Sequence, residues 1–157
     1  MKSNFIRLLI TISLMTFFTL CSKDKSVTGD GGETGGKYID GSYAGQTQID
    51  HEGYNALASV KVSQHRITDV EWRIYDNNLK RIFDDTYEEV FAGNEVYMQQ
   101  CRDNRSGMAV FGPRLIETQE LDSVDNITGA TWSYRKFRDV MQTTLKDACQ
   151  DTTADQE

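Results

Sequence analysis

The residues best suited to chemistry form a short turn ahead of an amphipathic segment. The run Thr128–Ser133 holds three hydroxyl side chains, one glycine and one alanine. From Ser133 onward apolar residues return every three or four positions, which predicts a helix over 133–149. The run therefore lies at a helix N-terminus, where backbone N–H groups lack partners and the helix dipole is positive. Amide and hydroxyl donors in that place suit a phosphate monoester.

The same run has an ordinary reading as a helix cap. The hydroxyl of Thr131 or Ser133 would bond the backbone of the first turn, and Gly129 would ease the turn. Residue types alone favour this reading, because hydroxyl residues and glycine are common ahead of helices. Trp132 also has two readings, stacking on a bound ring or packing in the core, and its type favours packing.

The stretch DNITGATWS at 125–133 resembles the signature of the FMN-binding domain family. That domain occurs in the flavin-carrying subunits of the sodium-translocating NADH:quinone reductase and of the Rnf complex. In those subunits FMN is joined by a phosphoester to the hydroxyl at the last motif position, usually threonine and here Ser133. The resemblance implies that FMN is the cofactor and that Ser133 is the candidate for its covalent attachment.

The resemblance also assigns roles within the turn. Asp125 is expected to fix the loop by accepting backbone N–H bonds, because a carboxylate touching a phosphate would repel it. Attachment would need a separate exported flavin transferase, since nothing in the sequence activates the Ser133 hydroxyl. The residues expected around the phosphate and the ring are Thr128, Gly129, Ala130, Thr131, Trp132 and Ser133.

The resemblance extends beyond the turn. The segment 40–45 is similar to the family's opening strand, and 60–62 and 67–70 are similar to its second and third strands. The segment 115–119 resembles the helical stretch ahead of the signature. The match covers 38–149, which is the expected FMN-binding domain. The family also includes small membrane-anchored lipoproteins described as major membrane immunogens, and this chain resembles them.

Alternating residues predict a sheet that would position this turn. The segments 42–49, 56–62 and 70–75 alternate between apolar and polar side chains and are separated by turn residues. We expect a three-stranded antiparallel meander, with a possible extra strand, in which Trp72 is a core residue. With helices covering one face of this antiparallel sheet, the predicted fold class is α+β.

Helical spacing appears between the sheet and the turn. Apolar residues recur at that spacing from Leu79 to Phe91 and stop at 93–94, which predicts a helix packed on the sheet. Pro113 is then expected in the first turn of a short helix that runs toward Leu121.

The N-terminal segment resembles a bacterial lipoprotein signal. Basic residues precede an apolar run, Leu8–Leu20, that is too short to span a membrane comfortably, and Cys21 follows directly. We expect 1–21 to be a lipoprotein signal peptide with lipid attached to Cys21. A plain secretory signal or an uncleaved anchor is the alternative.

Two further segments do not look like parts of a packed domain. Glycine alternates with charged and hydroxyl residues over 22–37, which is typical of a flexible tether. The segment 150–157 is expected to be an acidic disordered tail.

Charge and cysteine content narrow the function. The net charge of −7 argues against nucleic-acid binding, which requires a basic surface. Two histidines in separate predicted turns give no metal site. Cys101 and Cys149 are a candidate disulfide in an oxidising compartment, or two separate thiols.

These observations predict an extracytoplasmic FMN-binding lipoprotein, facing the periplasm or the cell exterior. It would carry electrons in a membrane-associated redox chain rather than act as a stand-alone enzyme. Its partners would be the membrane, through lipid, a flavin transferase and redox proteins. The alternative is a non-catalytic surface lipoprotein, an antigen or interaction module, that keeps the fold without flavin. A hydrolase with Ser133 as nucleophile is disfavoured, because the sequence has no Gly-x-Ser-x-Gly elbow.

Overall fold

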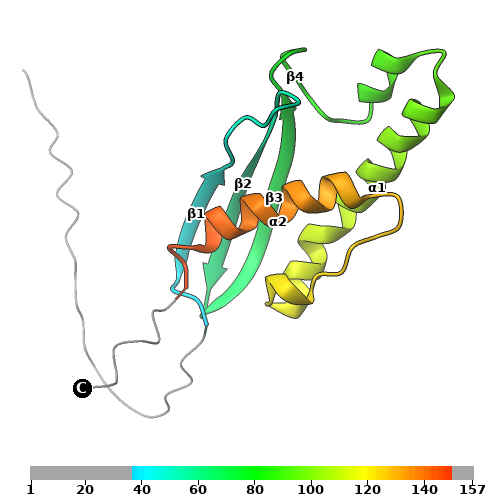
Figure 1. The fold of residues 1–157 in the computed structure, drawn as a ribbon. Helices are drawn as coiled ribbons and strands as arrows, with labels where there is room; N and C mark the ends of the chain where they lie inside the picture. Colours follow the sequence, from blue (N-terminus) through cyan, green and yellow to red (C-terminus); the bar gives the residue numbers. More distant parts are fainter. Residues whose placement is uncertain (1–36, 150–157) are drawn as a thin grey trace, which may run out of the picture. The chain divides into compact units, whose positions relative to one another are not determined.

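The computed structural model describes residues 37–149, which fold around one antiparallel sheet (Figure 1). The sheet has four strands in the order β1-β2-β3-β4. The elements in chain order are β1 (Gly41–Gln46), β2 (Tyr54–Ser63), β3 (Arg66–Asp76), β4 (Arg81–Ile82), the 3-10 helix η1 (Tyr87–Phe91), α1 (Glu95–Thr118), the 3-10 helix η2 (Leu121–Ser123) and α2 (Thr131–Leu145).

Strand alternation sorts the side chains between the two faces of the sheet. On β2, Ala56, Val60 and Val62 are buried, whereas Ser59 and Lys61 are exposed. The antiparallel register places Val60 opposite Val70 of β3, so both strands turn the same kind of side chain toward the helices. The predicted meander is confirmed, and β4 is the additional strand.

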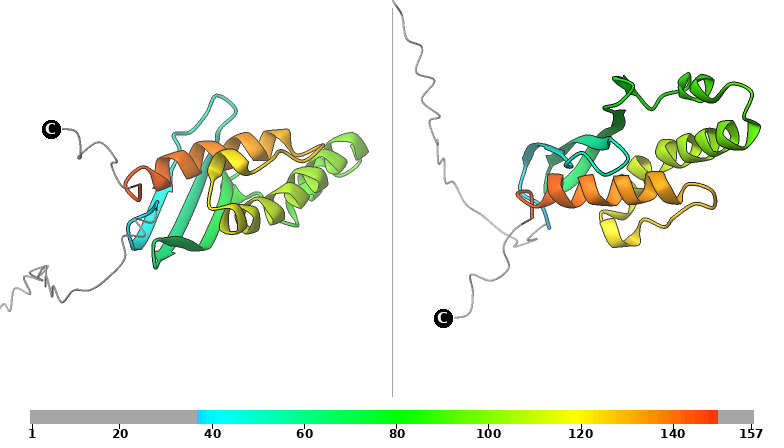
Figure 2. Two further views of the ribbon diagram at one scale, coloured as in Figure 1. Left: turned by 90° about the horizontal axis from the view of Figure 1, so that it is seen from below. Right: turned by 45° about the horizontal axis from the view of Figure 1, so that its top comes forward.

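Both helices cover the same face of the sheet. Helix α2 packs on β1 and β2, α1 packs on β3, and the two helices contact each other (Figures 1 and 2). Between them and the sheet, Phe111 and Phe137 are fully buried. Trp72 is half-buried; its ring lies 5.1 Å from that of Phe137, and its indole N–H donates to the Met108 carbonyl at 3.2 Å. The predicted α+β class, with helices on one face, is confirmed.

The helix predicted over Leu79–Phe91 is wrong. This segment instead forms the short β4, a loop and η1. The Asp84 carboxylate accepts hydrogen bonds from both the amide and the hydroxyl of Thr86, a local capture of the backbone that competes with helix formation. Phe83 and Tyr87 are nevertheless buried, so their spacing reports burial rather than helical structure.

The helix predicted to begin near Pro113 is also wrong, because Pro113 lies inside the 24-residue α1. That helix begins after Asn94, whose side chain accepts the Tyr97 amide, and it ends at Gln119 with φ +60°. The carbonyl that loses its helical partner belongs to Ala109, an exposed residue, so water can reach it.

The two cysteines of the described segment do not pair with each other. Cys101 is buried beside Phe83 and Tyr87, whereas Cys149 is exposed and pairs with Tyr38 in an isolated bridge after the end of α2. The candidate disulfide is therefore not formed, because the start of α1 and the residues after α2, which carry the two thiols, lie at opposite ends of the domain (Figure 1).

The predicted signal peptide with Cys21, nearly all of the tether and the acidic tail lie outside the described residues. Within 37–149, no helix is long and apolar enough to cross a membrane.

Candidate functional site

The predicted phosphate turn lies at the N-terminus of α2, as expected. Thr128, Gly129 and Thr131 are exposed, and Gly129 has φ +85°, a conformation that favours glycine. Ala130 is the N-cap and provides no side-chain hydrogen bond. Among the described residues, the amides of Thr131 and Trp132 have no acceptor, so two N–H donors remain available at the positive end of the helix.

Small residues let α1 approach this turn closely. A Cβ on Gly107 of α1 would lie 2.4 Å from the Cβ of Ala130, which is fully buried. The alanine of the motif is therefore needed for helix packing, and the exposed part of the turn is Thr128, Gly129 and Thr131.

Ser133 is fully buried and fastens α2 to α1. Its amide donates to Asn104 Oδ1 at 3.0 Å, and its hydroxyl lies 3.0 Å from the carbonyls of Asn104 and Ala130. A phosphoester at Oγ would require the two helices to separate here. No sequence motif marks Asn104, which lies 29 residues before Ser133.

Asp125 does not take the role predicted for it. It is exposed and accepts no hydrogen bond from the described residues. The loop is held instead by Asn126, which donates to Thr131 Oγ1 at 3.0 Å, and by Tyr134, whose hydroxyl donates to the Val124 carbonyl at 2.7 Å.

A carboxylate that sequence reasoning missed lies beside the turn. A Cβ built on Gly129 would lie 3.1 Å from Asp103 Oδ2, so this group of α1 lies next to the N-terminus of α2. Its other oxygen accepts the Gln99 side-chain amide at 2.7 Å. The negative charge is favourable for the helix dipole, but it competes with any anion that binds the turn.

An aromatic cavity of about 430 Å³ opens beside the turn. Its walls come from β2, the loop after β4, η1, α1 and α2. Trp132 belongs to both the turn and the cavity, and Asn104 lines the cavity while it holds Ser133. The lining residues are the aromatic Tyr54, Phe83, Tyr87, Phe91, Tyr97 and Trp132, together with Glu52, Gln100, Cys101 and Asn104.

The six aromatic rings form a continuous series around this cavity. Trp132 contacts Tyr54 edge to face, with ring centroids 5.1 Å apart, and lies 5.2 Å from Phe83. The series continues from Phe83 through Tyr87 to the remaining two rings, Phe91 and Tyr97, which are stacked at 5.3 Å. Trp132 thus packs against neighbouring rings and also presents a surface to the cavity.

A polar chain runs from the aromatic wall, at Tyr54 and Tyr87, to the buried carboxylate of Asp76. The Tyr87 hydroxyl donates to Asp76 Oδ2, and the Tyr54 hydroxyl lies 2.9 Å from that of Tyr87. Burial alone would raise the pKa of Asp76, but hydrogen bonds from Tyr87 and from the amides of Leu79 and Asn78 outweigh it and lower that pKa. Burial, reinforced by the bond to Asp76, raises the pKa of Tyr87.

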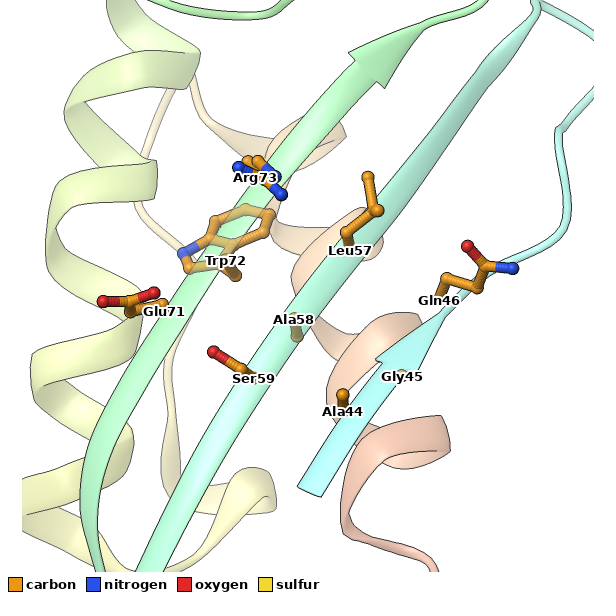
Figure 3. A pocket seen from close by; sticks show the side chains of 9 residues that line it. All are labelled: Ala44, Gly45, Gln46, Leu57, Ala58, Ser59, Glu71, Trp72 and Arg73. Carbon is orange, nitrogen blue, oxygen red and sulfur yellow. The ribbon is translucent and has the colours of Figure 1, made fainter. Parts of the chain in front are cut away.

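A larger hollow, of about 580 Å³, lies on the solvent-facing side of the sheet (Figure 3). The small side chains of Ala44 and Ser59 leave this hollow open, and Leu57 and Arg73 stand at its border (Figure 3). None of the predicted site residues lines it. We place the candidate site at the aromatic cavity, because rings, free amides and exposed hydroxyls converge there.

Metal chemistry finds no support in this part of the chain. Among residues 37–149, no group of three His, Cys, Asp or Glu side chains is arranged to hold a metal ion. Cys101 lines the cavity, and burial raises the pKa of its thiol, so it is not an activated nucleophile.

Comparison with known proteins supports the fold. No family model and no curated protein match the chain. The crystal structure of the CPE2226 protein from Clostridium perfringens is similar, with 28% identity and a TM-score of 0.51 over 71% of this chain and 88% of that chain. A solution structure from Clostridium thermocellum aligns over 69% and 90% of the two chains, with 20% identity and a TM-score of 0.41. The first similarity agrees with an α+β fold.

Proposed function

We propose that this chain binds FMN and carries electrons as a lipid-tethered protein outside the cytoplasm. The observation that carries the proposal is the junction at Trp132 between a helix N-terminus with free amides and a cavity walled by aromatic rings. A phosphate and a flat ring on one ligand need two such subsites side by side. When bound, FMN supplies the redox chemistry, and the chain supplies binding and orientation.

The phosphate would bind the exposed part of the turn. The free amides of Thr131 and Trp132 point from a helix N-terminus, and the Thr128 and Thr131 hydroxyls add donors. Gly129 has no side chain to obstruct an approaching ligand. The turn fits a phosphate once the Asp103 side chain rotates away from Gly129.

The ring would bind in the aromatic cavity. Flat heteroaromatic rings pack well on aromatic side chains in offset or edge-to-face arrangements. Tyr97 is 51% exposed and therefore accessible to a ligand, whereas Phe83 and Tyr87 are buried and form a fixed base. Water is excluded from that inner part of the wall, which strengthens each hydrogen bond to the ligand.

This arrangement supports reversible binding best. Covalent attachment at Ser133 would need a flavin transferase and an opening between α1 and α2, because the hydroxyl is fully buried. The membrane tether through Cys21 rests on the basic start, the apolar run and the glycine-rich segment that follows.

The second candidate function is a surface lipoprotein that keeps the fold without flavin. Asp103 favours it, because a carboxylate already lies at the N-terminus of α2 and completes the turn without a ligand.

The absorption spectrum of the purified full-length chain separates the two candidates. We expect flavin bands after FMN is added and unbound ligand is removed, and we expect FMN to bind more tightly than riboflavin, which lacks the phosphate. Equal affinities would show that the turn is not a phosphate site. A chain that retains neither flavin would exclude the FMN-binding function and favour the second candidate.

A further inference from the structure

Three hydrogen-bond donors of the aromatic cavity wall, the Tyr54 and Tyr87 hydroxyls and the Trp132 indole N–H, are engaged within the protein. Asp76 is 2% exposed, and its depressed pKa keeps it a carboxylate, which can only accept. Tyr87 must therefore give its single proton to Asp76. The hydrogen bond between the two tyrosines then takes its proton from Tyr54, so the Tyr54 oxygen can only accept from a ligand.

The neighbouring polar groups follow the same pattern. The Trp132 indole N–H donates to Glu52 at 3.2 Å, and the Glu52 carboxylate has only acceptors to offer. Asn104 donates one of its two side-chain N–H groups to the Gln100 carbonyl and accepts from the Ser133 amide. Among the described residues, the uncommitted donors of the wall are the Tyr97 hydroxyl, the second Asn104 N–H, the Gln100 side chain and the weakly donating Cys101 thiol, and Tyr54 Oη is the hydroxyl oxygen that can only accept.

We infer that the aromatic cavity selects a flat ring bearing an N–H group, and that Tyr54 Oη accepts this hydrogen bond. The ligand identity rests on the proposed function: in FMN the N–H is N3–H of the pyrimidine edge. Tyr54 is then a specificity-determining residue whose orientation is set by Tyr87 and Asp76. The chain of hydroxyls ends on the buried carboxylate of Asp76, which can only accept hydrogen bonds. Each hydroxyl therefore donates toward Asp76.

An analogue without this N–H should be rejected. A site built to hydrogen-bond a ligand group leaves its own buried group unpaired when the ligand lacks it. The loss corresponds to about tenfold in affinity for one hydrogen bond. N3-methyl-FMN keeps the phosphate and the ring system, so it changes this one contact and adds one methyl group.

The test compares FMN with N3-methyl-FMN on the full-length chain by fluorescence titration. The wild type should bind the methylated analogue about tenfold more weakly than FMN. Tyr54→Phe keeps the ring but removes the acceptor, so FMN should weaken and the ratio should approach one. Tyr75→Phe, the same change on the opposite face of the sheet, is the matched control and should leave the ratio unchanged.

Asp76→Asn probes the direction of the chain. An asparagine amide can donate to Tyr87, which would let Tyr87 donate to Tyr54 and turn the Tyr54 proton toward the cavity. Discrimination against N3-methyl-FMN should then fall. Thermal unfolding verifies that each variant is folded. If Asp76→Asn does not fold, Tyr54→Phe still tests the inference.

The outcomes are distinct. Equal binding of the two flavins by the wild type overturns the inference and leaves FMN binding intact. A ratio that survives Tyr54→Phe shows a steric effect and also overturns it. If neither flavin binds, the proposed function fails. The role of Tyr54 Oη as an acceptor is then tested by comparing the affinities of indole and 1-methylindole. A preference for indole that Tyr54→Phe abolishes supports the inference, and equal binding of these two overturns it.

Discussion

Replacement of Asp103 by asparagine should strengthen FMN binding and should lower the free energy of unfolding of the ligand-free protein. Asp103 lies beside Gly129 at the N-terminus of α2, where its charge opposes a bound phosphate. Two unit charges 4 Å apart interact by about 1 kcal/mol in water and about 4 kcal/mol near a protein surface. For a half-exposed, rotatable carboxylate we expect about 1–2 kcal/mol, which is roughly a 5- to 30-fold gain in affinity.

The same substitution removes a negative charge from the N-terminus of a helix. Without ligand this should cost about 0.3–1 kcal/mol in the free energy of unfolding. The two effects have opposite signs, so a general loss of structure cannot mimic them. Riboflavin affinity should not change, because riboflavin carries no phosphate.

The assay is a fluorescence titration of FMN and riboflavin at two ionic strengths, paired with urea unfolding of the ligand-free chain. The gain for FMN should shrink at high salt, because screening weakens the repulsion. Asp139→Asn, a charge change on the exposed side of α2, is the matched control. Unchanged or weakened FMN binding by Asp103→Asn would refute a phosphate at this turn.

Four further results are expected. Trp72→Ala should lower the free energy of unfolding by about 3 kcal/mol in urea titrations, since its ring packs on Phe137; a loss below about 1 kcal/mol would contradict that packing. Ser133→Ala should cost about 1–2 kcal/mol of stability, because the Asn104 carbonyl loses a buried donor, yet it should leave reversible FMN binding intact; a large loss of affinity would instead place the hydroxyl at the phosphate. The folded state lowers the pKa of Asp76, so its contribution to stability is present above its unfolded pKa of about 4 and is lost as the pH falls through the folded pKa. In acid unfolding, the free energy of unfolding of Asp76→Asn should therefore fall less over this pH range than that of the wild type. Cys21→Ala should release the protein from membranes or block its processing, and unchanged fractionation and migration would exclude the lipid anchor.

The sheet and α2 could be predicted because their patterns depend on burial of one face. Alternation over 56–62 reflects a strand with helices on one side and water on the other, so local sequence carries the information. The segment 79–91 misled the same method. Its apolar spacing is real, but the side chain of Asp84 holds the backbone in a turn, and β4, with two residues, is too short to show a periodic pattern.

The candidate site also has one part that the sequence predicts and one part that it does not. The turn at 128–133 was recognisable because its members are consecutive. The aromatic cavity was not, since its rings come from positions between Tyr54 and Trp132 that meet only after the chain folds. The sequence does not reveal Asn104 and Asp103, because they meet Ser133 and Gly129 only after α1 has packed against the turn. The residues next to them in the sequence form no motif.

The bond between Ser133 and Asn104 sets an order of events for any covalent modification. In the folded domain the Ser133 hydroxyl is inaccessible, so a transferase would have to act before α1 docks on α2. For the exported protein that we propose, the time available would be the interval between export of the chain and completion of folding. Variants that slow docking of α1, such as Gly107→Ala, which would crowd Ala130, should then prolong that interval. Modification would compete kinetically with folding, and the modified fraction would record which process was faster.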